Sequence, residues 1–183
     1  MTMNRAMNCL IRLASLTDAV RIQEIALSRR VSGTSQEITG LIDYPVPSIE
    51  KYKKRVVAAR FYVAETDSSN VIGFMDAYTN NKLGEVFGDD PVIKEISLLS
   101  TSPFIYINTI AVLKQYEGKG VSSDLFSRLE SELVGYKQIW AAIVHKPLRN
   151  IISVAVFSKA GFTFEEEIRA FEKYTFGLYK KKL

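Results

Sequence analysis

The short stretch QYEGKG, residues 115–120, places Gly118 and Gly120 between an apolar run and an amphipathic segment that begins at Val121. The first N–H groups of a helix have no intrahelical partners and carry partial positive charge, so they attract anions. Glycines in front of a helix remove the side chains that would hold an anion away. The alternative is that both glycines supply only the positive φ of a tight turn. The two glycines alone do not separate these interpretations.

Two familiar phosphate-binding motifs do not fit this loop. A Walker A loop needs Lys and then Ser or Thr after its last glycine, whereas Val121 and Ser122 follow Gly120. A dinucleotide fingerprint needs a third glycine where this chain has Ser123. It also favours an acidic residue about twenty positions further on, where the next apolar run has Trp140 and alanines instead. The loop belongs to neither class.

Strand-like segments precede and follow the loop. β-branched and aromatic residues, with turn residues between the runs, predict strands over 10–16, 61–65, 71–78, 104–113 and 138–144. Residues 67–70 (DSSN) join the second and third of these as a hairpin turn. A closing antiparallel pair is expected within 163–168 and 173–179.

Helical periodicity predicts the remaining elements. The expected helices are 17–30 with Thr17 as N-cap and Ile22, Ile25, Ala26 and Arg29 on one face, 48–60, and 89–99 started by Asp89 or Asp90. Val121, Leu125, Leu129 and Leu133 recur every four residues and predict a further helix. Residues 31–47 are expected to be a loop, and 150–161 favour a strand locally. The order indicates a mixed sheet flanked by helices, in a single domain over residues 1–183.

Two stretches carry a family resemblance. IAVLKQYEGKGVSSDLF, residues 110–126, resembles the acyl-CoA-binding motif of the GNAT acyltransferase superfamily, in which an apolar strand, the pattern Q/R-x-x-G-x-G/A and a helix follow one another. PLRNIISVAVFSKAGF, residues 147–162, is similar to the second motif, with Asn150, Ser153, Gly161 and Phe162. The resemblance implies a GNAT-like α/β (α+β mixed) fold, a splayed sheet of about seven strands with about four helices. It also implies that residues 150–160 form a helix.

The resemblance implies acetyl-CoA as acyl donor. The residues contain no metal-ligand cluster, so no metal is expected. The sheet would open after the strand that ends at Val112, with pantetheine along the backbone of Ile110 to Val112 and pyrophosphate on the N–H groups from Tyr116 to Ser122. Close backbone approach is then the better interpretation of the glycines. For Lys119 the alternative is a solvated side chain, and for Asn150 an N-cap. The expected cofactor residues are Ile110, Ala111, Val112, Gln115, Tyr116, Glu117, Gly118, Lys119, Gly120, Val121, Ser122, Asn150, Ser153 and Phe157.

Acyl transfer to an amine needs a neutral nucleophile, a polarised carbonyl and a proton for the leaving thiolate. Backbone N–H groups near Ala111 or Val112 can polarise the carbonyl. Many members of the superfamily have a Tyr in the second motif to protonate the thiolate, and the matching residue here is Phe157, which has no proton to give. Either Tyr106 or a water then serves as the acid, or the thiolate leaves unassisted.

The general base is not evident from the residues. The candidates are Asp76 and Asn108 on strands at the edge of the acceptor site, although an amide such as Asn108 can only orient a water. The alternative for Asp76 is a surface or hydrogen-bonded residue. We expect the sole histidine, His145, to be a surface side chain and Cys9 to be a thiol in the core.

The acceptor is expected to be an amine on a small molecule or peptide. The loop 31–47 with Tyr44 resembles the variable region that shapes the acceptor pocket in the superfamily, and Phe74 and Tyr106 are further candidates. The insertion 79–103, with Phe87 and Asp89, offers a second wall. Polyamines, amino acids, antibiotics and protein N-termini all stay open, and a homodimer is a further possibility.

Composition bounds the remaining classes. Hydrophobic residues make up 47% of the chain and charged residues 24%, as in ordinary soluble proteins. A single cysteine fits a reducing, cytoplasmic location, and we expect no signal peptide and no membrane span. The lysines at 180–182 are expected to be a solvated tail. A non-catalytic acyl-CoA-binding module is the alternative function, and a nucleic-acid-binding protein, suggested only by the pI of 9.1, ranks last.

Overall fold

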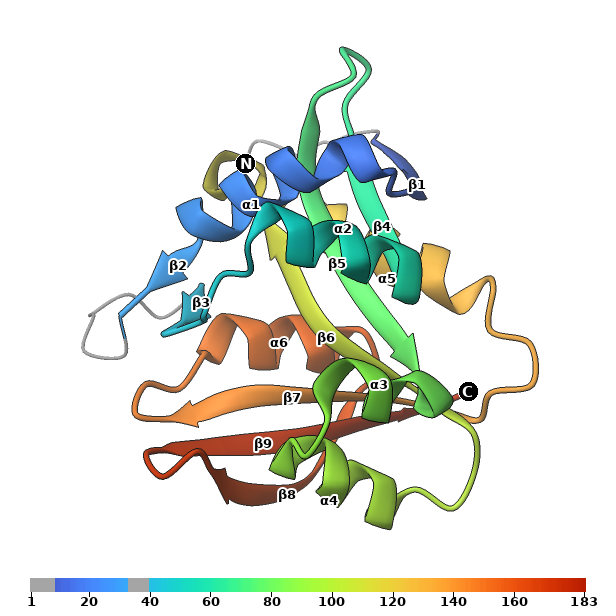
Figure 1. Ribbon diagram of the computed structural model, residues 1–183, viewed down its shortest axis with the longest axis vertical. Helices are drawn as coiled ribbons and strands as arrows, with labels where there is room; N and C mark the ends of the chain where they lie inside the picture. Colours follow the sequence, from blue (N-terminus) through green and yellow to red (C-terminus); the bar gives the residue numbers. More distant parts are fainter. Residues whose placement is uncertain (1–8, 33–39) are drawn as a thin grey trace, which may run out of the picture. The chain divides into compact units, whose positions relative to one another are not determined.

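The structure, a computed structural model, describes residues 9–32 and 40–183. Seven strands form a mixed sheet in the order β1-β4-β5-β6-β7-β9-β8 (Figure 1). β6 and β7 are parallel, whereas β1–β4, β7–β9 and β8–β9 are antiparallel. The chain divides into two compact units, and two of the boundaries between them fall within β5 and β6. The expected seven-stranded GNAT-like sheet is confirmed.

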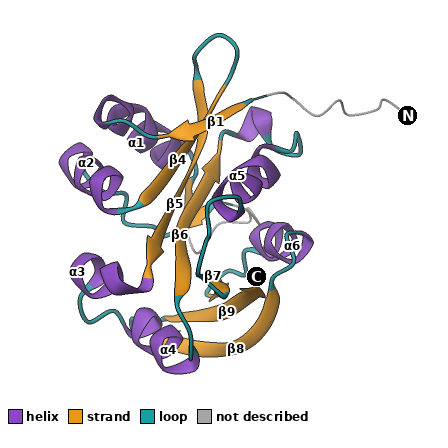
Figure 2. Ribbon diagram, turned by 90° about the vertical axis from the view of Figure 1, so that its right-hand side faces the viewer, coloured by secondary structure: helices purple, strands orange, loops and turns teal. Residues whose placement is uncertain are grey.

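Unit 1 comprises the chain up to Arg29, Pro45–Asp76 and Thr109–Leu133. Figure 2 shows its helices α1 and α2 on one face of its strands and α5 on the other face. Three apolar residues predicted for the inner face of α1 are buried, together with Ala19. The bounds of its elements are β1 Leu10–Leu13, α1 Ala19–Ser28, α2 Ile49–Ala58, β4 Arg60–Glu65 and α5 Val121–Glu130.

The start of α1 differs from the prediction. Thr17 is not the N-cap, because a 3-10 turn over Leu16–Asp18 begins with a capping box between Ser15 and Asp18. The backbone N–H of Ser15 donates to Asp18 at 2.7 Å, and Arg12 donates to both carboxylate oxygens of Asp18. Arg12 is the main reason why the pKa of Asp18 falls to about 2. The same turn ends β1 at Leu13, three residues earlier than expected.

Unit 2 comprises Arg30–Tyr44, Ala77–Asn108 and Val134–Leu183. The segment 31–47, expected to be a loop, contains part of a short parallel pair in which Arg30 faces Leu41 and Val31 faces Ile42. The insertion 79–103 contains two helices, and Asp90 caps the second by accepting from the N–H of Val92 at 2.8 Å. The bounds are β2 Arg30–Val31, β3 Leu41–Ile42, α3 Leu83–Phe87, α4 Pro91–Leu99, β7 Gln138–Lys146, α6 Ile151–Lys159, β8 Thr163–Ala170 and β9 Tyr174–Lys182.

Residues 151–159 form the helix α6, although branched residues dominate the segment. The resemblance was right here and the local strand preference was wrong, since the side chain of Asn150 caps the helix. The lysines at 180–182 lie in β9 and are no solvated tail. The described residues hold six α-helices, more than the expected four or so, because the insertion contributes two.

Two strands cross the unit boundaries. β5 spans Val71–Thr79 and β6 spans Phe104–Val112, close to the predicted bounds. α5 ends at Glu130, so Leu133, which was expected to continue the helix, lies in the turn beyond it. Across residues 9–32 and 40–183, no helix combines the length and the apolar character that a bilayer span requires.

Candidate active site

The glycine loop lies between the end of β6 and the start of α5 in unit 1. Gly118 has φ 71° and Gly120 has φ 92°, so both need the left-handed backbone that favours glycine. A Cβ at either position would meet nothing within 4 Å. The conformational reason for the glycines is therefore confirmed. The open space also leaves their backbone accessible from outside.

The N-terminus of α5 leaves its first N–H groups for an outside partner. The first bond of the helix runs from the N–H of Asp124 to the carbonyl of Gly120, at 3.1 Å. Gly120 is the N-cap and has no side chain that could cap these groups. The amides of Val121, Ser122 and Ser123 precede that first bond, so they have no intrahelical acceptor. An anion in front of Gly120 is the partner that this geometry favours.

Charged side chains of the loop have partners within unit 1. The ammonium of Lys119 lies 5.2 Å from the centre of the Tyr116 ring, which favours a cation–π contact over a fully solvated side chain. The carboxylate of Glu117 accepts a hydrogen bond from the guanidinium of Arg29, at the end of α1. Arg29 was predicted only as a residue on the inner face of its helix, and its contact with the loop was missed. The two residues are 88 positions apart, so no local pattern could have indicated the contact.

The strand before the loop holds the residues expected to contact pantetheine. β6 pairs with β7 from Phe104 to Ile107 and itself continues to Val112. Ile110, Ala111 and Val112 therefore follow the paired part of the strand. At this end, the N–H of Leu113 donates to the carbonyl of Ile72 at 2.9 Å. The backbone of β6 is thus fixed to β5.

Asn150 makes two side-chain hydrogen bonds in unit 2. Its Oδ1 accepts from the N–H of Ser153 at 3.1 Å, which confirms the N-cap interpretation. Its Nδ2 donates to the carbonyl of Gly40 at 2.8 Å. Phe157, one of the two aromatic residues near the end of α6, is buried with its ring 5.0 Å from that of Phe162. The contacts of Asn150 and Phe157 with a cofactor stay predictions.

Asp76 is buried completely in unit 1, with its Oδ2 3.6 Å from Nη1 of Arg55. The surface position considered for Asp76 is therefore wrong, and its role as a base stays a prediction. Phe74 is also buried completely, and its ring packs 6.2 Å from Tyr52 and 5.7 Å from Phe61. No surface of the Phe74 side chain is left for a substrate. Its position is that of a core residue.

Three aromatic rings meet in unit 2, and one of them belongs to Tyr106, which is a candidate both for the acceptor pocket and for the general acid. Phe87 from α3 lies 5.0 Å from Tyr78 and 5.9 Å from Tyr106, edge to face in both cases. The insertion therefore packs directly against β6, next to the candidate acid Tyr106. Asn108, two residues along the strand, is half-buried, as is Tyr44. Tyr106 and Asn108 thus follow one another along the same strand.

His145 is not the surface residue that we expected. Its side chain is 4% exposed, Nδ1 contacts Oε1 of Glu167 at 2.5 Å, and Nε2 lies 3.0 Å from the hydroxyl of Tyr179. The ring occupies the space above Gly177, where a Cβ would come within 2.4 Å of it. A glycine inside a predicted strand often marks such a close approach, so Gly177 was the available signal.

Cys9 precedes β1 and is half-buried, so the prediction of a core thiol was wrong. Its Sγ donates to Oδ2 of Asp124 at 3.5 Å. Burial, and then the neighbouring carboxylate, raise the pKa of the thiol to about 11. The thiol is therefore protonated near neutral pH and is a poor nucleophile.

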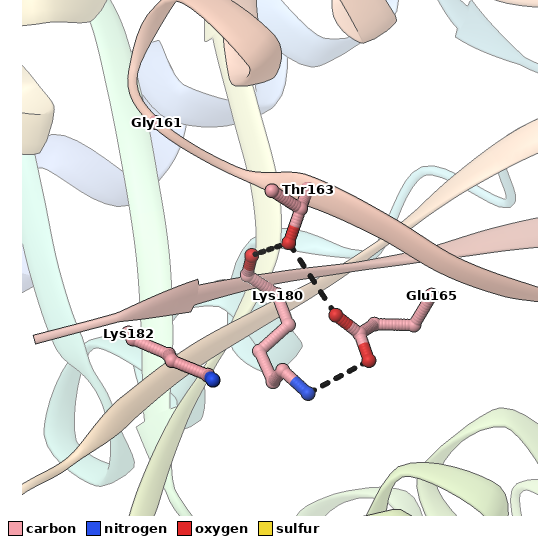
Figure 3. A pocket seen from close by; sticks show the side chains of 5 residues that line it. All are labelled: Gly161, Thr163, Glu165, Lys180 and Lys182. Atoms are coloured by element: carbon pink, nitrogen blue, oxygen red, sulfur yellow. Dashed lines mark hydrogen bonds and ion pairs between the residues drawn. The ribbon is translucent and has the colours of Figure 1, made fainter.

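An open pocket of about 420 Å³ lies beside β8 and β9 in unit 2 (Figure 3). Lys180 donates to Glu165 at 2.7 Å, so these two charges in its wall offset each other. None of the residues expected in the acyltransferase site lines this pocket. Within residues 9–32 and 40–183, no group of three or more His, Cys, Asp or Glu side chains is placed to hold a metal ion.

Comparison with known proteins identifies the family. The sequence model of the acetyltransferase (GNAT) family matches residues 34–162. The chain belongs to this family and is an acyltransferase. No curated protein matches the chain.

Solved structures share the fold at low identity. A putative phosphinothricin N-acetyltransferase is 21% identical, with a TM-score of 0.64 over 96% of this chain and 99% of that one. NAA60 from Arabidopsis thaliana, in complex with a bisubstrate analogue, is 14% identical, with a TM-score of 0.68 over 96% and 98%. A phosphinothricin acetyltransferase from Sinorhizobium meliloti, in complex with AcCoA, is 18% identical, with a TM-score of 0.63 over 97% and 89%.

Proposed function

We propose that the protein transfers an acetyl group from acetyl-CoA to a primary amine of a small molecule or peptide by direct attack. The observation that carries the proposal is the glycine loop, with open space in front of Gly118 and Gly120 and the unoccupied N–H groups of α5 behind it. Family membership adds the reaction class. The Arabidopsis and Sinorhizobium proteins, both solved in complex with acetyl-CoA, support this donor.

The residues present fit a diphosphate-bearing donor. The amides from Gly118 to Ser122 would hold the diphosphate, because a helix N-terminus and a glycine loop favour an anion. The expected range began at Tyr116, but the N–H groups of Tyr116 and Glu117 donate to the carbonyls of Leu113 and Lys114, at 2.8 and 3.2 Å, so they are not available to the anion. The backbone of Ile110 to Val112 would hold the pantetheine arm. Bound acetyl-CoA would supply the thioester carbonyl. Backbone N–H groups near Ala111 or Val112 would stabilise the negative charge that develops on its oxygen.

The chain's own residues would move two protons and form no covalent bond with the substrate. The attacking nitrogen forms a C–N bond as the C–S bond breaks, the nitrogen loses one proton, and the thiolate gains one. Tyr106 is our candidate for the acid that protonates the leaving thiolate, because this tyrosine lies on β6, the strand that also carries Ile110 to Val112. Asn108 would orient a water that accepts the proton lost by the attacking nitrogen. No covalent enzyme intermediate is required.

Release of free CoA thiol with a panel of amines tests the proposal. The panel should contain polyamines, amino acids, aminoglycosides and peptides with free N-termini. We expect turnover with one of these classes and none with the same acceptor after N-acetylation. Tight acetyl-CoA binding in calorimetry without turnover across the panel would instead show a non-catalytic acyl-CoA-binding module. Absence of both binding and turnover would exclude the two functions together.

A further inference from the structure

An acidic side chain sits inside the loop that we assign to the diphosphate. Glu117 comes directly before Gly118, and its side chain is 37% exposed. An unpaired carboxylate at this position would repel a diphosphate, because two like charges a few ångströms apart near a protein surface repel each other strongly enough to weaken binding. The loop's own Lys119 lies against the ring of Tyr116. The charge of Glu117 therefore needs another partner.

That partner is Arg29, whose guanidinium donates from Nη2 to Oε1 of Glu117. The side chain of Arg29 is only 8% exposed. A buried guanidinium is costly unless it is paired, so the contact with Glu117 is a firm one rather than a transient surface pair. The pair joins the end of α1 to the loop between η3, the 3-10 turn over Lys114–Tyr116, and α5.

We propose that Arg29 is a positioning residue of the donor site: it neutralises Glu117 and holds that carboxylate toward α1, away from the diphosphate. The proposal rests on the proposed function, because it takes the glycine loop as the diphosphate site. Arg29 would not touch the donor. Arg29 acts through Glu117. Once that carboxylate is neutralised, the diphosphate interacts only with the partial positive charge of the amides from Gly118 onward.

A simpler role for Arg29 is available. A cation at the end of a helix interacts favourably with the partial negative charge of its last carbonyl groups, and Arg29 is the C-cap of α1. That role would affect stability without depending on Glu117. The two roles therefore predict different outcomes when Glu117 is also changed.

Calorimetric titration of acetyl-CoA into four proteins separates these roles: wild type, Arg29→Met, Glu117→Gln and the double variant. We expect Arg29→Met to raise the Kd about tenfold, from the Coulomb repulsion of one unpaired charge. Glu117→Gln should bind at least as tightly as wild type. The double variant should return to within about threefold of wild type, because the repelling charge is gone. The gap between Arg29→Met and the double variant should narrow as salt is added.

Thermal melts of the same proteins show whether a loss of affinity is a loss of fold. Arg128→Met is the matched control, since it removes an exposed arginine from α5 whose guanidinium contacts Glu132 at 2.6 Å, and it should leave the Kd unchanged. If Arg29→Met does not fold, Arg29→Gln takes its place in the cycle. Equal weakening in the single and double variants would overturn the proposal. A wild type that does not bind acetyl-CoA would instead contradict the proposed function, before any variant is made.

Discussion

Glycines serve opposite purposes in the two units. In unit 1, Gly118 and Gly120 have left-handed backbone, and the position of a missing Cβ faces open space. In unit 2, Gly177 lies in the extended strand β9, and the imidazole of His145 fills the place of its missing Cβ. The first site is built from backbone and is open to the outside. The second is closed by a side chain of the protein itself.

This difference separates a binding role from a packing role. A glycine whose neighbouring space the protein fills is explained by the fold, and it needs no ligand. A glycine with positive φ is explained by the turn, but the open space beside it is not. At Gly118 and Gly120 that space adjoins the first amides of α5, which have no intrahelical acceptor, so an anion can bind there. Substitutions at both sites can test the comparison.

The largest effect is expected for Gly120→Val. The side chain would project where the diphosphate approaches, and loss of two charge-assisted hydrogen bonds would weaken acetyl-CoA binding more than about 100-fold. The left-handed φ should also cost about 1–2 kcal/mol of stability, without unfolding the protein. Calorimetry with a thermal melt measures both effects.

Gly84→Val is the matched control, because a Cβ there also meets nothing within 4 Å but the backbone is helical. It should leave acetyl-CoA binding unchanged. A folded Gly120→Val protein with wild-type affinity would remove the glycine loop from the donor site. An unfolded one would show that the role of Gly120 is conformational.

Gly177→Ala should act on stability instead. Its Cβ would displace the His145 ring, with loss of the contacts to Glu167 and Tyr179, and overpacking of this kind costs about 1–3 kcal/mol. Urea unfolding measures the loss. In combination with His145→Ala, the contacts with the imidazole at 2.4 Å are gone and only the Tyr179 ring, 3.0 Å from the added methyl group, has to shift, so the cost of Gly177→Ala should be smaller in that background. Equal costs in both backgrounds would contradict the packing role.

Asn150→Ala tests a side chain of unit 2 that both caps a helix and holds Gly40. We expect about 1 kcal/mol of lost stability from the cap. We also expect a modest weakening of acetyl-CoA binding, of about 1 kcal/mol, as for one neutral hydrogen bond. Urea unfolding and calorimetry give the two values. A loss of several kcal/mol in binding would point to collapse of α6 rather than to a lost contact.

Phe157→Tyr has the smallest expected effect. A required general acid contributes about 100-fold or more, and the new hydroxyl would supply one if the wild type lacked it. We expect no gain, because Phe157 is buried against Phe162 and a hydroxyl there must be desolvated. The kcat of wild type, Phe157→Tyr and Tyr106→Phe across pH decides the matter. A tenfold faster Phe157→Tyr with an unchanged Tyr106→Phe would show that the wild type lacks an acid.

Local pattern predicted much of the fold. The strand β6, rich in β-branched and aromatic residues, and the amphipathic helix α5 appear close to their expected bounds, since their apolar residues are mostly buried. α6 is a different case, because its branched residues favour a strand and only the resemblance indicated a helix. The cap at Asn150 shows what outweighs that preference.

The missed features depend on contacts between distant segments. The pair of Arg29 with Glu117 and the place of His145 above Gly177 exist only once the sheet and helices are assembled. Phe74 was expected at a substrate site and lies in an aromatic core, since a strand pattern does not say which neighbours cover each face. Thr17 is not the N-cap because Ser15 and Asp18 form a capping box around it, and Arg12 holds the carboxylate of Asp18 in that turn.

The most direct test of the account is the amide NMR spectrum of the protein during titration with acetyl-CoA. Backbone N–H groups that bind a diphosphate shift strongly as the anion arrives. The account predicts that the largest shifts fall on Gly118, Lys119, Gly120, Val121 and Ser122, and that they are absent when pantetheine without the diphosphate is added. Saturable binding with these five amides unchanged would contradict the central claim.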